Sequence, residues 1–237
     1  MFTNALEKAA KRYQVKLTKT QIENFQAYND LLIEWNKKIN LTAIVEPEQV
    51  AIKHMIDSLS CYDKEIFKNK SKIIDVGTGA GFPGLPLKIW QDNLQLTLLD
   101  SLNKRVKFLD TVTETLKLNN VVTIHSRAED AGQKDIYREK YDIAVSRAVA
   151  RLNILCEICL PFVRTGGYFI ALKGAQYQEE AEEAKKAVKV LGGEIEKIVP
   201  VKLPGLEDSR AVVYIKKIKN TNKLYPRKAG TIEKSPL

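Results

Sequence analysis

Hydrophobic and polar positions follow two different periods along this chain. In the first sixty residues apolar side chains recur at steps of three and four, the spacing of amphipathic helices. This spacing predicts a short helix over residues 4–13, a long helix that begins after the capping pair Thr18 and Gln21, and another that begins at Pro47. Residues 1–64 are therefore expected to form an N-terminal helical cap.

From residue 72 onward, short apolar runs alternate with helical segments, which is the pattern of a parallel sheet covered on both faces. The expected strands are 72–76, 95–99, 121–125, 141–146 and 167–172, with helices at 84–91, 102–118, 151–163 and 176–191 and a short turn near 133–138. Two more apolar runs, 194–201 and 211–217, flank a loop too short for a right-handed parallel crossover. This last pair should be antiparallel at the edge of the sheet.

Seven strands that end in an antiparallel pair look like the class I S-adenosylmethionine (SAM) methyltransferase fold, an α/β, Rossmann-like architecture. A nicotinamide-binding domain would usually repeat its mononucleotide half in parallel. We expect residues 65–218 to form the SAM-binding domain, and residues 219–237 to form a basic tail.

The segment after the first expected strand has the composition of a cofactor-binding turn. Asp75 ends the strand, and Gly77, Gly79 and Gly81 follow at alternate positions before a helix. Glycine adopts φ > 0 and lets a ligand approach the backbone, while the first helical amides point at it. Such turns also occur in structural loops and in nicotinamide domains, so the turn alone favours a nucleotide-like cofactor without choosing one.

A second carboxylate, Asp100, ends the next expected strand and can accept two ribose hydroxyls. A dehydrogenase would place an acid at the same position, and the same side chain could instead cap the helix that follows. After the third strand, a backbone amide and an acid in the segment that contains Ala128 and Glu129 are placed to contact an adenine edge.

The loop after the fourth strand limits the type of reaction. Enzymes that methylate exocyclic amines resemble one another in an Asn/Asp-Pro-Pro-aromatic motif here, whereas residues 146–149 are Ser-Arg-Ala-Val. Cytosine C5 methylation needs a thiolate, yet Cys156 and Cys159 lie among apolar residues of an expected helix. The methyl acceptor that remains is a nucleophile with a free in-plane lone pair, such as guanine N7. For such an acceptor an enzyme has to align the two reactants but needs no general base.

Amino-acid composition limits the cellular compartment expected for the protein and the kind of molecule expected to bind it. The 237 residues contain no run of eighteen apolar residues and no secretory signal, so we expect a cytoplasmic protein without a membrane partner. Three cysteines and two histidines favour neither a disulfide framework nor a metal site. The net charge of +9 suggests a polyanionic partner such as nucleic acid, and much of it lies beyond residue 215.

The basic tail combines a stacking surface with phosphate-binding charge in Tyr225, Arg227 and Lys228. We predict that these residues contact RNA, the alternative being a solvated, partly disordered end. Lys37 and Lys173 would extend this RNA-binding surface.

Taken together, these segments resemble the bacterial glucose-inhibited division protein B (GidB, RsmG) family over nearly the whole chain. The matching segments are Trp35-Asn36, residues 40–44, His54 with Asp57 to Leu59, Asp75 to Leu87, residues 98–101 with Lys104-Arg105, residues 127–129, residues 146–148, Lys173-Gly174 and residues 225–230. The resemblance implies a SAM-dependent methyltransferase acting on N7 of a guanosine in the 530 loop of small-subunit (16S) ribosomal RNA.

The resemblance also implies roles for individual residues. It places Gly77, Gly79 and Phe82 around the methionine and ribose of SAM, Asp100 and Ser101 at the ribose, Ala128 and Glu129 at the adenine, and Arg147 at both the cofactor and the reaction centre. The Arg147 guanidinium can hold a phosphate or a guanine in a fork, or can pair with a nearby carboxylate instead. His54 and Asp57 share a helix face and are placed to cover the cofactor loop, contact RNA or brace the cap.

Two other functional classes stay open at this point. One is a nicotinamide-dependent oxidoreductase, and the other is an RNA-binding ribosome-assembly protein without turnover. The favoured hypothesis is a monomeric enzyme that uses SAM and acts on small-subunit rRNA or its precursor particle.

Overall fold

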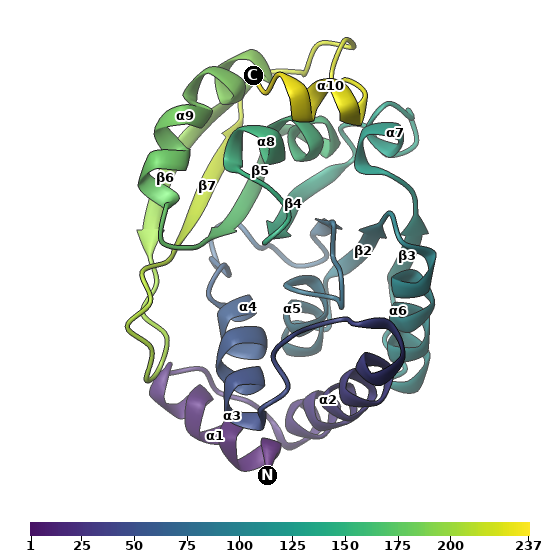
Figure 1. Ribbon diagram of the computed structural model, residues 1–237, viewed down its shortest axis with the longest axis vertical. Coiled ribbons are helices and arrows are strands. Elements are labelled where there is room, and N and C mark those ends of the chain that lie inside the picture. The colour runs from purple at the N-terminus through teal and green to yellow at the C-terminus, as the bar shows by residue number, and fades with distance from the viewer.

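A seven-stranded sheet runs through the middle of the molecule in the order β3-β2-β1-β4-β5-β7-β6 (Figure 1). The computed structural model describes all residues, 1–237. The strands are β1 (Lys72–Val76), β2 (Gln95–Asp100), β3 (Val121–His125), β4 (Tyr141–Arg147), β5 (Val163–Lys173), β6 (Gly193–Pro200) and β7 (Ala211–Lys217). The helices are α1 (Phe2–Arg12), α2 (Lys19–Ile39), α3 (Pro47–Val50), η1 (Ala51–Ile56), α4 (Asp57–Leu59), α5 (Gly84–Trp90), α6 (Asn103–Thr115), α7 (Ala128–Gly132), α8 (Leu152–Cys159), η2 (Leu160–Phe162), α9 (Tyr177–Val190) and α10 (Ala229–Lys234).

The direction of the strands matches the prediction. Strands β1 to β5 pair in parallel, β7 pairs antiparallel to β5 with Lys173 opposite Ala211, and β6 pairs antiparallel to β7. The order reverses at β1, whose two neighbours are β2 and β4. In such sheets the crevice at the carboxyl ends of the strands, where the order reverses, is the usual place for a ligand.

Each face of the sheet is covered by its own hydrophobic core, because side chains of a strand point alternately to opposite faces. On β7, Val212 and Tyr214 belong to the core formed with α1, α2, η1, α5 and α6, while Val213 and Ile215 belong to the core formed with α8 and α9. The N-terminal helices thus share one continuous core with the sheet. Division of the chain at residues 64 and 218 stays a prediction.

The long helix α2 closes over the glycine turn. Its N-terminus has the predicted capping box, in which Thr18 and Gln21 satisfy each other's backbone amides. In its middle the fully buried Tyr28 donates its hydroxyl hydrogen to the carbonyl of Ala80, inside the turn. The cap therefore fixes the position of the turn directly.

The helix predicted from Pro47 is continuous, but its central residues 51–56 form a π-helix between α3 and α4. A regular helix was therefore the wrong prediction there. Two short helices, α7 and α10, follow no clear periodicity and were not predicted, and the segment expected to be helical up to residue 163 becomes strand β5 at Val163. None of the helices combines the length and apolar character needed to cross a membrane.

Candidate active site

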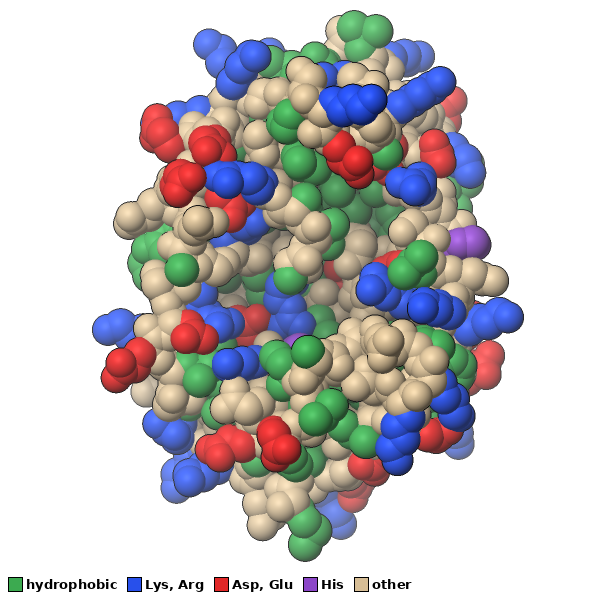
Figure 2. Space-filling model, in the orientation of Figure 1, with side chains coloured by type: hydrophobic (Ala, Val, Ile, Leu, Met, Phe, Trp, Pro, Cys, Tyr) green, Lys and Arg blue, Asp and Glu red, His purple; other side chains and the backbone are tan.

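The residues predicted to bind a cofactor gather at the carboxyl edge of the sheet. The glycine turn follows β1, Asp100 ends β2, Ala128 begins the helix after β3, and Arg147 ends β4. Figure 2 shows this face of the molecule hollowed at its centre, with Lys and Arg side chains on the floor and rim of the hollow. Parallel strands thus bring together residues that are far apart in sequence.

The three glycines of the turn serve different purposes, although all have positive φ, +70° at Gly77, +62° at Gly79 and +101° at Gly81. A Cβ on Gly81 would lie 2.4 Å from Leu85 Cδ1, and one on Gly77 would lie 2.7 Å from Val149 Cγ2. A Cβ on Gly79 would meet no atom within 4 Å. Gly77 and Gly81 are therefore needed for packing, whereas the space over Gly79 is open to a ligand.

Asp100 ties the turn to the second strand. One carboxylate oxygen accepts the Gly79 N–H at 2.9 Å and the other accepts the Leu102 N–H at 2.9 Å, while Arg105 Nη1 lies 3.5 Å away. Leu102 precedes the first residue of α6, so Asp100 fixes the turn that leads into this helix, and α6 has no side-chain cap. Each carboxylate oxygen has a second lone pair, so Asp100 can still accept a ribose hydroxyl.

Asp75 lies completely buried beneath the same turn. Its Oδ2 accepts hydrogen bonds from Thr78 Oγ1 at 2.7 Å and Gly84 N at 2.8 Å, while its Oδ1 has no partner. Burial raises the pKa of this carboxyl to about 7, against the effect of those two hydrogen bonds. An orphaned acceptor below the turn and open space over Gly79 fit a ligand rich in amino and hydroxyl donors, as SAM is.

The remaining predicted cofactor residues differ in their exposure. Ser101 is exposed, and Ala128 and Glu129 are half-buried in the first turn of α7. Phe82 is buried, with its ring stacked on His54 at a centroid distance of 4.5 Å and beneath the Arg147 guanidinium at 4.9 Å. Their contacts with a cofactor stay predictions.

Arg147 is held by the cap rather than free in the hollow. Its Nη1 donates to Asp57 Oδ2 at 2.8 Å and to the Lys53 carbonyl at 3.0 Å, and its Nη2 lies 3.3 Å from His54 Nδ1. Asp57 receives a second guanidinium on its other oxygen, from Arg210 Nη1 at 2.9 Å. The ion pair considered as the alternative for Arg147 therefore exists, and it anchors the guanidinium at the end of β4.

His54 completes this cluster as a neutral ring. Burial and the positive charge of Arg147 lower the pKa of His54 to about 3. Because Nδ1 faces the guanidinium donor, it acts as an acceptor, and the proton belongs on Nε2, which lies 2.8 Å from Thr42 Oγ1. Of the roles left open for His54 and Asp57, the structure shows them bracing the cap against Phe82 and Arg147.

This buried histidine predicts a pH dependence of stability. The folded pKa of about 3 lies below the ordinary value of 6.5, so the unfolded chain takes up the proton first and stability falls as the pH drops from 6.5 towards 3. A His54→Gln variant lacks this contribution. The difference between the unfolding free energies of wild type and variant should therefore shrink, by roughly 2–3 kcal/mol between pH 7 and 4.5.

Urea denaturation at several pH values measures this difference. The comparison with the variant is needed because the raised pKa of Asp75 acts in the opposite direction, adding stability as the pH falls from about 7. A difference between the two proteins that stays constant with pH would contradict a buried, neutral His54.

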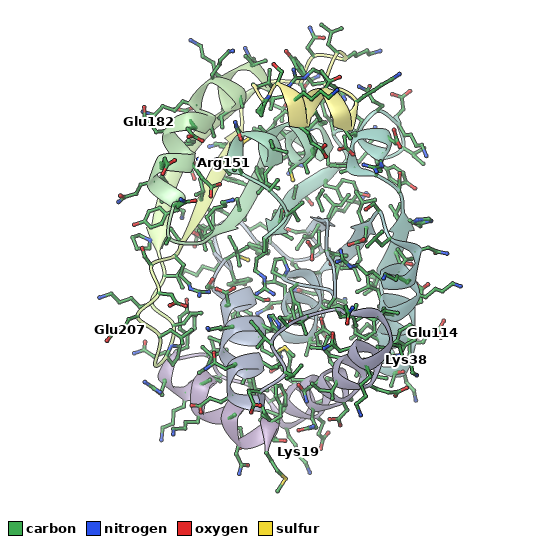
Figure 3. All side chains as sticks on the ribbon, in the orientation of Figure 1. Lys19, Lys38, Glu114, Arg151, Glu182 and Glu207 are labelled. Carbon is green, nitrogen blue, oxygen red and sulfur yellow. The ribbon has the colours of Figure 1, made fainter.

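The residues predicted to bind RNA fall into two groups. Lys37 is exposed in the last turn of α2, next to Lys38, which Figure 3 labels at the end of this helix beside α6. Lys173 is almost buried, and its ammonium donates to the Ala150 carbonyl at 2.8 Å and pairs with Glu180 at 2.6 Å. Lys37 is thus free to meet a phosphate, whereas Lys173 already has two partners.

The basic tail is packed against α7 and α8 (Figure 1). Arg227 donates three hydrogen bonds to Glu157, through its backbone N at 2.9 Å, Nε at 2.8 Å and Nη2 at 2.6 Å. Arg138 donates to the carbonyls of Tyr225 and Thr221. The structure thus shows a bracing role for Arg227, while the predicted RNA contacts of Tyr225, Arg227 and Lys228 remain untested.

Replacing Arg227 with Ala should therefore destabilise the fold strongly. Glu157 is fully buried, so the substitution would leave an unpaired charge in the core, which costs about 3–5 kcal/mol. Lys228→Ala, in the neighbouring position without a side-chain ion pair, should change stability by less than about 0.5 kcal/mol. Urea denaturation of both variants tests this, and equal stability of the two would mean that the tail does not brace the fold.

Sequence patterns did not identify Arg210 as part of this cluster. It precedes β7 and reaches the cap only because the loop between β6 and β7 folds back onto α1 and η1. A lone arginine between a polar loop and an apolar strand carries no local signal for this contact.

Comparison with known proteins identifies the family. The family model for GidB, described as rRNA small subunit methyltransferase G, matches residues 21–213. The chain belongs to the GidB family. A ribosomal RNA small subunit methyltransferase G of Desulforamulus reducens is 52% identical over 235 residues, 99% of this chain and 98% of the relative. One from Alkaliphilus oremlandii is 53% identical over 232 residues, 98% of this chain and 97% of the relative.

Solved structures agree with the GidB assignment at the level of the fold. M. jannaschii TYW2 in complex with AdoMet has a TM-score of 0.53 at 15% identity, covering 65% of this chain and 72% of that chain. Aeropyrum pernix fibrillarin, with natively bound S-adenosyl-L-methionine, has a TM-score of 0.50 at 16% identity, covering 66% and 71%. The class I SAM methyltransferase fold predicted from the strand pattern is confirmed.

Proposed function

We propose that this protein transfers the methyl group of SAM to N7 of a guanosine in the 530 loop of 16S ribosomal RNA. The observation that carries the proposal is near full-length identity of about 50% to curated small-subunit methyltransferase G proteins, combined with an open glycine turn in a methyltransferase fold. The oxidoreductase alternative has no support among these relatives.

The residues around the hollow fit a direct transfer. SAM, when bound, supplies a methyl group on a positively charged sulfur. The glycine turn and Asp100 would hold this cofactor, with Glu129 near the adenine. Guanine N7 carries its own lone pair, so no side chain has to remove a proton, and the neutral, buried His54 is consistent with that.

Arg147 is the residue best placed to orient the base. It lies at the end of β4, next to the strand that carries the glycine turn, and its guanidinium is fixed by Asp57 and the Lys53 carbonyl. Because this guanidinium is already held in one position, it can align an acceptor without a further loss of side-chain entropy. As further parts of this proposal, the enzyme acts as a monomer in the cytoplasm, on small-subunit rRNA or its precursor particle.

Incubation with labelled SAM and small subunits from a strain lacking the protein tests this function. We expect label in the 16S RNA as 7-methylguanosine. Binding of the subunit without transfer would favour the assembly-protein alternative instead. Calorimetry adds a cofactor test, in which affinity for NAD and none for SAM would contradict the proposal.

A further inference from the structure

A cavity of about 330 Å³ lies between the cap and the strands next to the cofactor turn. Its walls come from the end of β4 at Arg147, the end of β5 at Lys173 and the start of β7 beside Arg210, with Lys53 on the cap side. This volume is at the lower end of the range for small-ligand sites, roughly 300–1,000 Å³.

The cavity and the cofactor residues occupy opposite sides of the point where the strand order reverses. Gly79 follows β1, Asp100 ends β2 and Ala128 follows β3, whereas the cavity lies at the ends of β4 and β5 and the start of the antiparallel β7. Arg147 belongs to both groups. A substrate in the cavity would therefore lie beside the cofactor without competing for its binding residues.

Cations outnumber acids around the cavity. Lys53, Arg147, Lys173 and Arg210 line it, with Asp57 as the one acid in the lining. Two further acids pair with these cations from outside the lining, Glu180 with Lys173 at 2.6 Å and Asp208 with Arg210 at 3.3 Å. Asp57 already accepts from both guanidinium groups, at 2.8 Å and 2.9 Å. Its one negative charge is thus shared between two positive ones.

Two of the cations have donors that the protein leaves unsatisfied. Arg210 Nε is buried and has no hydrogen-bond partner, and Lys53 Nζ lies 3.9 Å from Asp208, beyond hydrogen-bond distance. A buried donor without an acceptor is costly, typically by about 1–3 kcal/mol. The cavity therefore favours a ligand that brings both negative charge and acceptor oxygens.

We propose that this cavity binds a phosphate group of the RNA next to the target guanosine, and that Arg210 and Lys53 are RNA-binding residues. The inference rests on the proposed function for the identity of the RNA. A phosphate matches a guanidinium fork and an ammonium better than an uncharged carbonyl does, because it also neutralises charge. Contacts of this kind fix the register of the nucleic acid without reading its sequence.

Asp57 connects this phosphate site to the reaction centre. It holds Arg210 through one oxygen and Arg147 through the other. The phosphate-binding group and the base-orienting group therefore keep a fixed spacing. A phosphate on Arg210 would place the attached nucleoside in reach of Arg147.

Binding of small subunits from the deletion strain, measured without turnover, tests the proposal in Arg210→Gln and Lys53→Gln. Each variant should bind at least tenfold more weakly and reduce the slope of log affinity against log salt by about one. Lys202→Gln, in the same loop as Arg210 but exposed and outside the cavity, serves as control and should bind within twofold of wild type. Affinity for SAM should stay within twofold in all three.

Arg210→Gln removes the ion pair with Asp57 and could loosen the cap, whereas Lys53→Gln leaves that pair intact and so tests RNA binding alone. Unchanged RNA binding in Lys53→Gln would overturn the proposal. A loss of SAM affinity equal to the loss of RNA affinity would also overturn it, because the cavity would then bind the carboxylate of the cofactor.

A smaller probe, 5′-GMP, should bind wild type at least tenfold more tightly than guanosine does, and equal affinities of the two would also overturn the proposal. These binding results do not depend on methyl transfer, so a wild type that binds as expected but transfers no methyl group would refute only the proposed function.

Discussion

Gly79→Val should lower the affinity for SAM at least a hundredfold and leave the protein folded. Gly79 has a φ of +62° and no protein atom within 4 Å of the place where a Cβ would project, so the new side chain would occupy the space left for the cofactor. The backbone strain of a non-glycine residue at this φ costs about 1–2 kcal/mol. Calorimetry with SAM and thermal unfolding measure the two effects separately.

Gly166→Val is the matched control for this strain. Gly166 has a φ of +84°, and a Cβ there would contact only the guanidinium end of Arg164, at 3.5 Å. The control should lose similar stability and keep its affinity for SAM. If Gly79→Val also keeps that affinity, the turn is structural and the cofactor binds elsewhere.

Arg147→Ala should reduce methyl transfer at least a hundredfold, because misplacement of a bound substrate by about 1 Å is enough for such a loss. Arg147→Lys should not restore activity, since one ammonium cannot reproduce a planar fork that contacts Asp57 through Nη1 and His54 through Nη2. Single-turnover assays at saturating SAM measure the effect.

The stability of both Arg147 variants serves as the control. Asp57 keeps its contact with Arg210, so the buried carboxylate is not left unpaired. Near wild-type turnover of a folded Arg147→Ala protein would show that Arg147 only braces the cap.

Much of the fold follows from local sequence. The boundaries of β1, β3 and β7 match the predicted ranges, because each is a short apolar run between polar turns. The capping box at Thr18 and the glycine turn are equally local signals, with the necessary residues within three or four positions of one another.

The features that sequence did not predict depend on contacts between distant segments. The role of Arg227 depends on Glu157, which lies 70 residues earlier and is buried only once α8 packs. Arg210 and Asp57 are 153 positions apart, and their contact depends on a loop that folds back to the cap. Local periodicity therefore carries no information about either contact.

The tail illustrates how charge alone can mislead an interpretation. Its basic residues suggested an RNA-binding segment, yet Arg227 is engaged with Glu157 and Ile232 of α10 belongs to the core on α8 and α9. An additional RNA contact at Lys228 or Tyr225 is still to be tested. Tail deletion would confound bracing with binding, so point variants are the better experiment.

Methylation of one guanosine at N7 is tested most directly by the modified nucleoside itself. Mass spectrometry of 16S rRNA fragments from cells with and without the gene should show a single 7-methylguanosine in the 530 loop that disappears on deletion and returns with the wild-type chain, but not with Gly79→Val. An unchanged level of this nucleoside on deletion, or loss of a different modification, would contradict the account.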